Sequence, residues 1–174
     1  MSDSSGLATV ILVIDTPEQM SEFGVFVAAH LTAGDLLALN GELGAGKTTF
    51  TRGLGRGLEV RGTVTSPTFV LARTHPRDGG APLVHVDAYR LSSAVELDDL
   101  DIDFEESIVV VEWAEGMLDG VSDSWLDFRI DRPVGATESD PEAEEGVEPR
   151  RVRVDGYGPR WQNLDWLESS PWRT

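Results

Sequence analysis

One stretch of the chain combines residue types and spacing that suit the binding of phosphate groups. It fits the pattern G-x-x-x-x-G-K-[ST] at every position and reads Gly41-Glu42-Leu43-Gly44-Ala45-Gly46-Lys47-Thr48. Glycines let a backbone turn its N–H groups inward, and such a nest at a helix N-terminus binds phosphate oxygens. Lys47 adds a positive charge for the outer phosphates, and the Thr48 hydroxyl can ligate magnesium. The pattern predicts a nucleotide-binding loop formed by Gly44, Ala45, Gly46, Lys47, Thr48 and Thr49.

Composition favours a functional role for the lysine of this stretch. Lys47 is the only lysine, and thirteen arginines supply the other positive charges. The alternative is a glycine-rich turn that fits the pattern by chance. That alternative is disfavoured because a strand and a helix are predicted on the two sides of the turn, in the order that phosphate binding requires.

Two acidic residues at predicted strand ends are candidates for a metal site. The mainly apolar run 83–86 is followed by Asp87, and the apolar run 108–111 is followed by Glu112. Ligands of open α/β sheets gather at the carboxyl ends of the strands, where such proteins place an acid directed at magnesium. The alternative for each residue is an ordinary solvated acid at a strand end.

The elements that must position these residues alternate between strands and helices. Strands are predicted over residues 9–14, 35–40, 83–87, 108–112 and 125–131. One helix is predicted from its cap at Thr16 to a stop at Gly34, and a second helix over residues 48–58. This order predicts an α/β fold of the P-loop NTPase class, with a single mixed, largely parallel β-sheet flanked by helices and an antiparallel C-terminal hairpin.

The segment 63–71 is predicted to be extended and is interrupted at Pro67. In a nucleotide hydrolase such a segment can act as a switch, because a hydroxyl can face the terminal phosphate or its metal. An ordinary edge strand with a proline bulge is the alternative, and the sequence favours neither.

The final part of the chain gives weaker signals. One or two short helices are predicted within residues 93–106, anchored by Leu97, Leu100, Ile102 and Phe104. Residues 137–149 hold six acids, no basic residue and two prolines, which predicts a mobile loop. A return strand over residues 151–155 and a terminal helix over residues 161–168 are expected to follow.

Length and charge limit the classes of protein to consider. The 174 residues suit one domain, with residues 1–6 as a flexible tail. A net charge of -17 argues against a general affinity for DNA or RNA, so any role on RNA would run through a partner. The absence of cysteine fits a cytoplasmic location, and no apolar run approaches the length of a membrane span.

Several motifs in this order resemble the TsaE family, small P-loop ATPases that assist bacterial synthesis of the threonylcarbamoyl modification on the tRNA adenosine next to the anticodon. The loop alone would not select a family, but the full set at these intervals is specific. The resemblance spans roughly residues 10 to 135. The motifs are Gly41 to Phe50, Ser66-Pro67-Thr68-Phe69, His85-Val86-Asp87-Ala88-Tyr89-Arg90-Leu91, Glu96-Leu97 and Val111-Glu112-Trp113.

The resemblance implies a magnesium-dependent ATPase that acts with the proteins TsaB and TsaD, of which TsaD carries out the threonylcarbamoyl transfer. ATP and Mg²⁺ would be its cofactors, and tRNA would be reached only through the complex. On the family pattern Thr48 and Glu112 ligate magnesium and Asp87 lies close by in the metal shell. The catalytic candidates are therefore Lys47, Asp87 and Glu112. The other candidates for nucleotide contact are Thr16, Thr68 and Arg150, and the sequence leaves open whether Arg150 reaches the nucleotide.

Two other classes of protein fit parts of this pattern. A small-molecule kinase would share the phosphate-binding loop, but it would be expected to carry a basic lid, and the corresponding region here is acidic. A nucleotide-sensing adaptor without significant hydrolysis is the second alternative. Assays of phosphate release with and without TsaB and TsaD would separate an adaptor from an ATPase.

Overall fold

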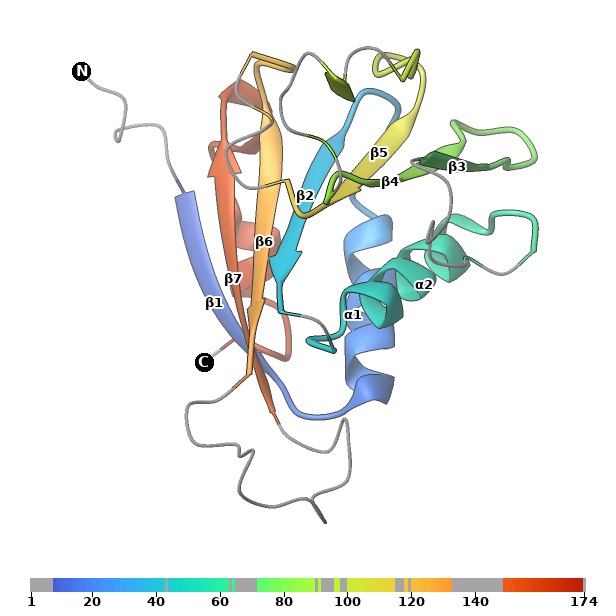
Figure 1. Cartoon of the computed structure of the whole chain (residues 1–174). Coiled ribbons are helices and arrows are strands. Elements are labelled where there is room, and N and C mark those ends of the chain that lie inside the picture. The colour runs from blue at the N-terminus through green and yellow to red at the C-terminus, as the bar shows by residue number, and fades with distance from the viewer. Residues whose placement is uncertain are drawn as a thin grey trace.

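The computed structural model describes residues 8–42, 44–62, 64, 72–89, 91, 96–97, 100–114, 118, 120–132 and 149–173. Its strands form one seven-stranded sheet with the order β1-β7-β6-β2-β5-β4-β3 (Figure 1). The strands are β1 (Ala8–Ile14), β2 (Leu36–Gly41), β3 (Ala72–His75), β4 (Leu83–Asp87), β5 (Ile108–Glu112), β6 (Trp125–Asp131) and β7 (Arg150–Tyr157). The helices whose bounds lie within the described residues are α1 (Pro17–Ala28), α2 (Lys47–Leu58), the 3-10 helix η2 (Pro159–Trp161) and α4 (Asp165–Glu168).

The sheet is mixed, as predicted. Strands β6, β2, β5 and β4 form its parallel centre. Strand β7 runs antiparallel to both β6 and β1, so β6 and β7 are the predicted C-terminal hairpin and β1 lies on the edge. Strand β3 pairs antiparallel with β4 on the other edge. Strand β3 was not predicted from the sequence, and β7 extends beyond its predicted range of 151–155 at both ends.

Each face of the sheet has its own core. Helices α1 and α2 lie side by side over one face (Figure 1), and Phe23 and Phe50 pack there against Phe128 of β6. The second core includes Val86 of β4 and Val109 and Val111 of β5. The segments before and after β5 contribute Leu97 and Leu118 to it. The predicted apolar anchors Leu100, Ile102 and Phe104 pack against this second core.

Glycines allow α1 and α2 to approach closely. A Cβ atom added at Gly53 would lie 2.1 Å from the backbone oxygen of Ser21, and one added at Gly24 would lie 2.4 Å from that of Phe50. Glycine inside a helix costs stability, because it loses more backbone freedom on folding than other residues do. This close approach explains why α2 carries glycine at such positions, and it fixes the helix that follows the predicted nucleotide loop.

Helix α1 begins as predicted but ends earlier. Thr16 is its N-cap, and the Thr16 hydroxyl accepts a hydrogen bond from the Gln19 N–H at 3.1 Å. The helix was expected to continue to Gly34, but it ends at Ala28, and the next turns are i→i−3 bonds from His30 and Leu31. Leu31 is nevertheless buried, at 8 % exposure, so the core on this face includes a residue beyond the end of the helix.

Two further helix predictions were right in part but gave too long a range. Glu96 and Leu97 are helical, as predicted, whereas residues 100–106 are not helical. In that stretch Asp101 has a φ of 60° and the Asp103 carboxylate accepts the Glu106 N–H. The terminal helix is one turn long because Asn163 accepts a hydrogen bond from the Asp165 N–H and so delays the helix start.

Two C-terminal tryptophans pack the end of the chain against α1 and the turn that follows it. Trp166 stacks on His30 with 4.3 Å between ring centroids, and Trp172 packs edge-on against Phe23 and Phe26. The Trp172 carbonyl also accepts the Val13 N–H of the edge strand β1. Burial of large aromatic surface therefore joins α1, β1 and the C-terminus.

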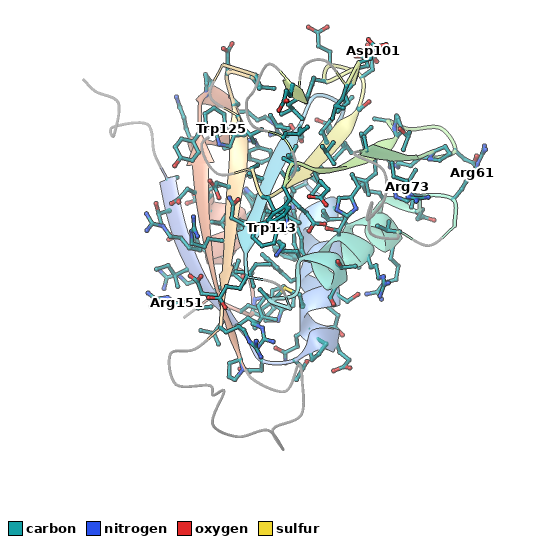
Figure 2. The ribbon with its side chains drawn as sticks, viewed as in Figure 1. Arg61, Arg73, Asp101, Trp113, Trp125 and Arg151 are labelled. Atoms are coloured by element: carbon teal, nitrogen blue, oxygen red, sulfur yellow. The ribbon has the colours of Figure 1, made fainter. Side chains whose placement is uncertain are left out.

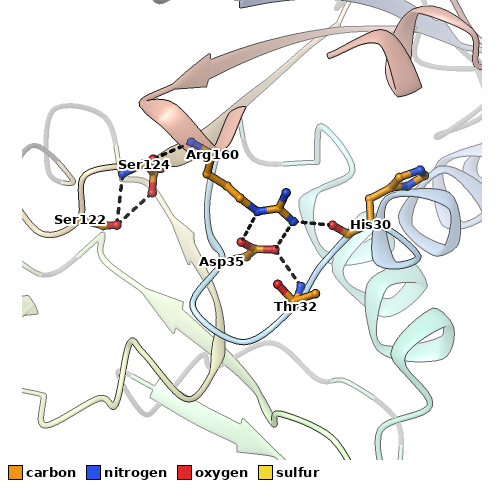
Figure 3. Close-up of polar contacts among 6 residues, drawn as sticks. All are labelled: His30, Thr32, Asp35, Ser122, Ser124 and Arg160. Atoms are coloured by element: carbon orange, nitrogen blue, oxygen red, sulfur yellow. Dashed lines mark hydrogen bonds and ion pairs between the residues drawn. The ribbon is translucent and has the colours of Figure 1, made fainter. Parts of the chain in front are cut away.

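An ion pair between Arg160 and Asp35 lies at the amino end of β2 (Figure 3). Arg160 donates from Nε to Asp35 Oδ1 at 3.1 Å and from Nη2 to Asp35 Oδ2 at 3.2 Å. The second Asp35 oxygen also accepts the Thr32 N–H, and Arg160 reaches the His30 carbonyl. Asp35 is 5 % exposed, so its charge depends on these donors rather than on water.

Arg160→Ala is expected to lower the free energy of unfolding by about 2 kcal/mol, because it leaves the buried Asp35 carboxylate with fewer donors. Urea unfolding measures this change. Arg173→Ala is the control, because Arg173 pairs with Glu168 at the surface, where both side chains are about half exposed. Equal losses in the two variants would show that the burial of Asp35 does not matter.

Several predicted features lie outside the described residues, namely the N-terminal tail, all but Val64 of segment 63–71 and all but Pro149 of the acidic segment 137–149. Within the described ranges, no helix has the length and apolarity needed to span a membrane.

Candidate functional site

The predicted phosphate loop connects β2 to α2 at the carboxyl end of the parallel strands. Gly44 and Gly46 have φ values of 82° and 116°, which are unfavourable for residues with a side chain. Gly46 is the N-cap of α2, and the first intrahelical bond of α2 runs from the Phe50 N–H to the Gly46 carbonyl. The N–H groups of Lys47, Thr48 and Thr49 thus precede the helical hydrogen-bond pattern, and their N-cap residue, a glycine, has no side chain to cap them. This geometry suits an anion.

Lys47 is folded back over its own loop. Its Nζ donates to the Gly41 carbonyl at 2.6 Å and to the Glu42 carbonyl at 3.0 Å. Nζ also lies 4.1 Å from the ring centroid of Trp113, and the lysine is only 6 % exposed. Burial lowers the pKa of Lys47, while the negative charges of Glu112 and Asp87 act in the opposite direction. The lysine therefore shares one site with both candidate acids.

The two acids lie side by side at the same edge of the sheet as the loop. Asp87 at the end of β4 is paired with Glu112 at the end of β5, and Glu112 is paired in turn with Leu39 of β2. Backbone bonds of 2.9 Å from Ala88 to Glu112 and from Trp113 to Leu39 continue this arrangement past the strand ends. The structure thus brings together the predicted loop, Lys47, Asp87 and Glu112.

Glu112 has a buried histidine partner that was not among the predicted site residues. His85 is fully buried, and its Nε2 is hydrogen-bonded to Glu112 Oε2. An ionised carboxylate can only accept, so with ionised Glu112 the Nε2 atom carries the ring hydrogen. Strand alternation places His85 and Asp87 on one face of β4, which is the signal that could have identified His85.

Two aromatic residues border the lysine. Trp113 follows β5 with a φ of 62°, an uncommon value for a residue with a side chain, and Figure 2 shows it near the amino end of α2. Tyr89 packs edge-on against Trp113 at 5.3 Å between centroids, and its N–H donates to Asp87 Oδ1 at 2.9 Å. Tyr89 is 70 % exposed, so this aromatic pair extends from the buried lysine to the surface.

The other predicted nucleotide contacts have different outcomes. Arg150 reaches the loop, where Nε donates to the Ala45 carbonyl at 3.0 Å. The Thr16 hydroxyl is used in capping α1, so its contact with a nucleotide stays a prediction. Met20 lies one turn after Thr16, close to Gly46 of the loop. A Cβ atom added at Gly46 would be within van der Waals distance of the Met20 side chain. Thr68 lies outside the described residues.

The donor set fits a nucleotide with magnesium better than a metal held by protein alone. Among the described residues there is no group of three or more His, Cys, Asp or Glu side chains that could hold a metal ion. Magnesium keeps several waters and takes one or two carboxylates together with phosphate oxygens. Asp87, Glu112 and the Thr48 hydroxyl are donors of that kind beside an anion-binding loop.

Comparison with known proteins gives a consistent family assignment. The family model described as "Threonylcarbamoyl adenosine biosynthesis protein TsaE" matches residues 14–138. A Streptomyces coelicolor protein named "tRNA threonylcarbamoyladenosine biosynthesis protein TsaE" is 55 % identical over 84 % of this chain and 96 % of its own length. A Bacillus subtilis protein of the same name is 42 % identical over 85 % of this chain and 86 % of its own.

A solved structure agrees with the sequence comparisons. The crystal structure of Bacillus subtilis YdiB matches with a TM-score of 0.66 and 26 % identity, covering 93 % of each chain. The fold, the phosphate loop and the matched sequence range therefore agree with the same family. The chain belongs to the TsaE family of tRNA threonylcarbamoyladenosine biosynthesis proteins.

Proposed function

We propose that the chain binds ATP with Mg²⁺ at the loop between β2 and α2 and hydrolyses it as an accessory protein of threonylcarbamoyladenosine synthesis, acting with TsaB and TsaD. The main observation behind this proposal is that three features lie together at one edge of the sheet. They are the uncapped N–H groups at the start of α2, the buried Lys47, and the adjacent acids Asp87 and Glu112.

The position of each residue suggests its role in the proposed site. The backbone N–H groups and Lys47 hold the phosphates, because both present positive charge at the start of α2. Bound magnesium would neutralise charge on the phosphate oxygens, with Thr48, Asp87 and Glu112 as the residues that hold it. His85 fixes the orientation of the Glu112 carboxylate through its hydrogen bond to Oε2. Trp113 and Tyr89 keep water away from one side of Lys47.

Phosphate release from ATP, measured with the chain alone and with TsaB and TsaD added, tests the proposal. We expect slow release by the chain alone and faster release in the complex, with both rates dependent on magnesium. Nucleotide binding without release in either setting would support the alternative of a nucleotide-sensing adaptor. Transfer of phosphate to a small molecule would support a kinase.

Glu112→Gln is expected to reduce phosphate release in the complex by about 100-fold or more, while ATP affinity changes by less than about fivefold, because an amide keeps the volume but loses the charge that holds a metal. Asp87→Asn is expected to act in the same direction. Glu106→Gln is the control, because Glu106 is an exposed acid that precedes β5. Normal release by both site variants would show that neither the Asp87 nor the Glu112 carboxylate is needed for hydrolysis.

A further inference from the structure

The backbone carbonyls of the phosphate loop accept hydrogen bonds from two basic side chains, one from α2 and one from β7. Lys47 binds the carbonyls of Gly41 and Glu42. Arg150 binds the carbonyl of Ala45 at 3.0 Å through Nε and that of Gly44 at 3.4 Å through Nη2. When a loop turns its N–H groups inward to form a nest, its carbonyls point outward and need donors of their own.

These two basic residues differ in what nucleotide binding demands of them. Lys47 is a residue of the phosphate-binding pattern, so it must leave the Gly41 and Glu42 carbonyls in order to reach a phosphate. Arg150 approaches the loop from β7, where it is paired with Ile14 of β1 and is 7 % exposed. A guanidinium held by a sheet strand can stay in place, and its planar fork suits two neighbouring carbonyl acceptors.

We propose that Arg150 is a positioning residue that keeps the phosphate loop in its binding conformation and does so without touching the nucleotide. This inference rests on the proposed nucleotide site. Gly44 and Gly46 make the loop conformation possible, but they also make other conformations accessible to the unbound loop. Bonds from Arg150 to the Gly44 and Ala45 carbonyls favour one of these conformations before any ligand arrives, which lowers the entropy cost of binding.

The first test needs no nucleotide. Amide hydrogen exchange of the unbound chain reports how often the loop opens. In Arg150→Ala we expect exchange of the Ala45 amide, which donates to the Glu42 carbonyl at 3.0 Å, to become about tenfold faster, the effect of losing one charged hydrogen bond. Arg151→Ala is the matched control, because Arg151 is the next residue of β7 and is exposed (Figure 2). Unchanged exchange at Ala45 in Arg150→Ala would overturn the proposal.

The second test separates positioning from direct contact. Calorimetric titration with ATP and with ADP, each with magnesium, should show that Arg150→Ala lowers both affinities by the same factor of about ten, because the same loop binds both ligands. A loss for ATP that clearly exceeds the loss for ADP would mean that Arg150 touches the terminal phosphate, and would overturn the proposal. Arg150→Lys should lie between wild type and alanine, since it keeps the charge but not the fork.

The two tests distinguish failure of this inference from failure of the proposed function. If wild type binds neither nucleotide, the proposed function fails, and the exchange experiment still decides whether Arg150 holds the loop. If wild type binds and Arg150→Ala binds equally well, with a lower melting temperature only, Arg150 is a structural residue and the inference is wrong.

Discussion

Lys47→Ala is expected to lower the affinity for ATP by about 100-fold, because two charge-assisted hydrogen bonds to phosphate are together worth roughly 3 kcal/mol. Lys47 is the basic residue of the phosphate-binding pattern, and Arg150 also binds the loop, at the Ala45 carbonyl. Binding should therefore weaken strongly without loss of the loop conformation. Calorimetric titration with ATP and magnesium measures the change.

The control for this prediction is Arg56→Ala. Arg56 lies on the last turn of α2 and is exposed, so the variant removes the same charge from the same helix at a distance from the loop. We expect its ATP affinity to equal that of wild type. Similar affinities for Lys47→Ala and Arg56→Ala would mean that Lys47 does not meet the phosphates.

Gly53→Ala is expected to have the largest effect on stability. Alanine favours a helix over glycine by about 1 kcal/mol, so propensity alone predicts stabilisation. In this structure the added Cβ atom would lie 2.1 Å from the Ser21 backbone oxygen, so α1 and α2 would have to separate. We therefore expect the free energy of unfolding to fall by about 2 kcal/mol or more, as measured by urea unfolding.

Gly80→Ala is the matched control for Gly53→Ala. An added Cβ atom at Gly80 meets the far end of the Arg77 side chain, which would have to shift while it donates to the Leu58 and Ala81 carbonyls. A smaller loss, of about 1 kcal/mol, is expected there, because part of these hydrogen bonds would be given up. If Gly53→Ala instead stabilises the chain, the close contact between α1 and α2 is not a feature of the folded protein.

The sequence was most informative where a local rule decides the structure. The loop from Gly41 to Thr48 follows from a pattern with a fixed chemical purpose, and β4, β6 and α2 follow from apolar periodicity. Parallel pairing then implies that Asp87 and Glu112 meet at one sheet edge, as the structure shows. These features depend on short stretches of the chain, so a single sequence suffices to predict them.

The sequence was least informative where contacts between distant segments decide the structure. The hydrogen bond of His85 to Glu112 joins residues from different strands, and Arg150 reaches a loop more than a hundred positions earlier in the chain. The early end of α1 and the short α4 depend on turn bonds made by single side chains or carbonyls. Apolar periodicity contains no signal for such contacts.

Nucleotide phosphates are proposed to bind at the start of α2. Amide chemical shifts measured by NMR during titration with ATP and magnesium test this claim most directly. We predict the largest shifts at Gly46, Lys47, Thr48 and Thr49, with smaller changes at the Trp113 indole. A cavity at the amino ends of β2 and β6, away from the phosphate loop, is lined by Gly34, Asp35, Ser122 and Arg160 among others. Shifts confined to that cavity, with the α2 amides unchanged, would contradict the account.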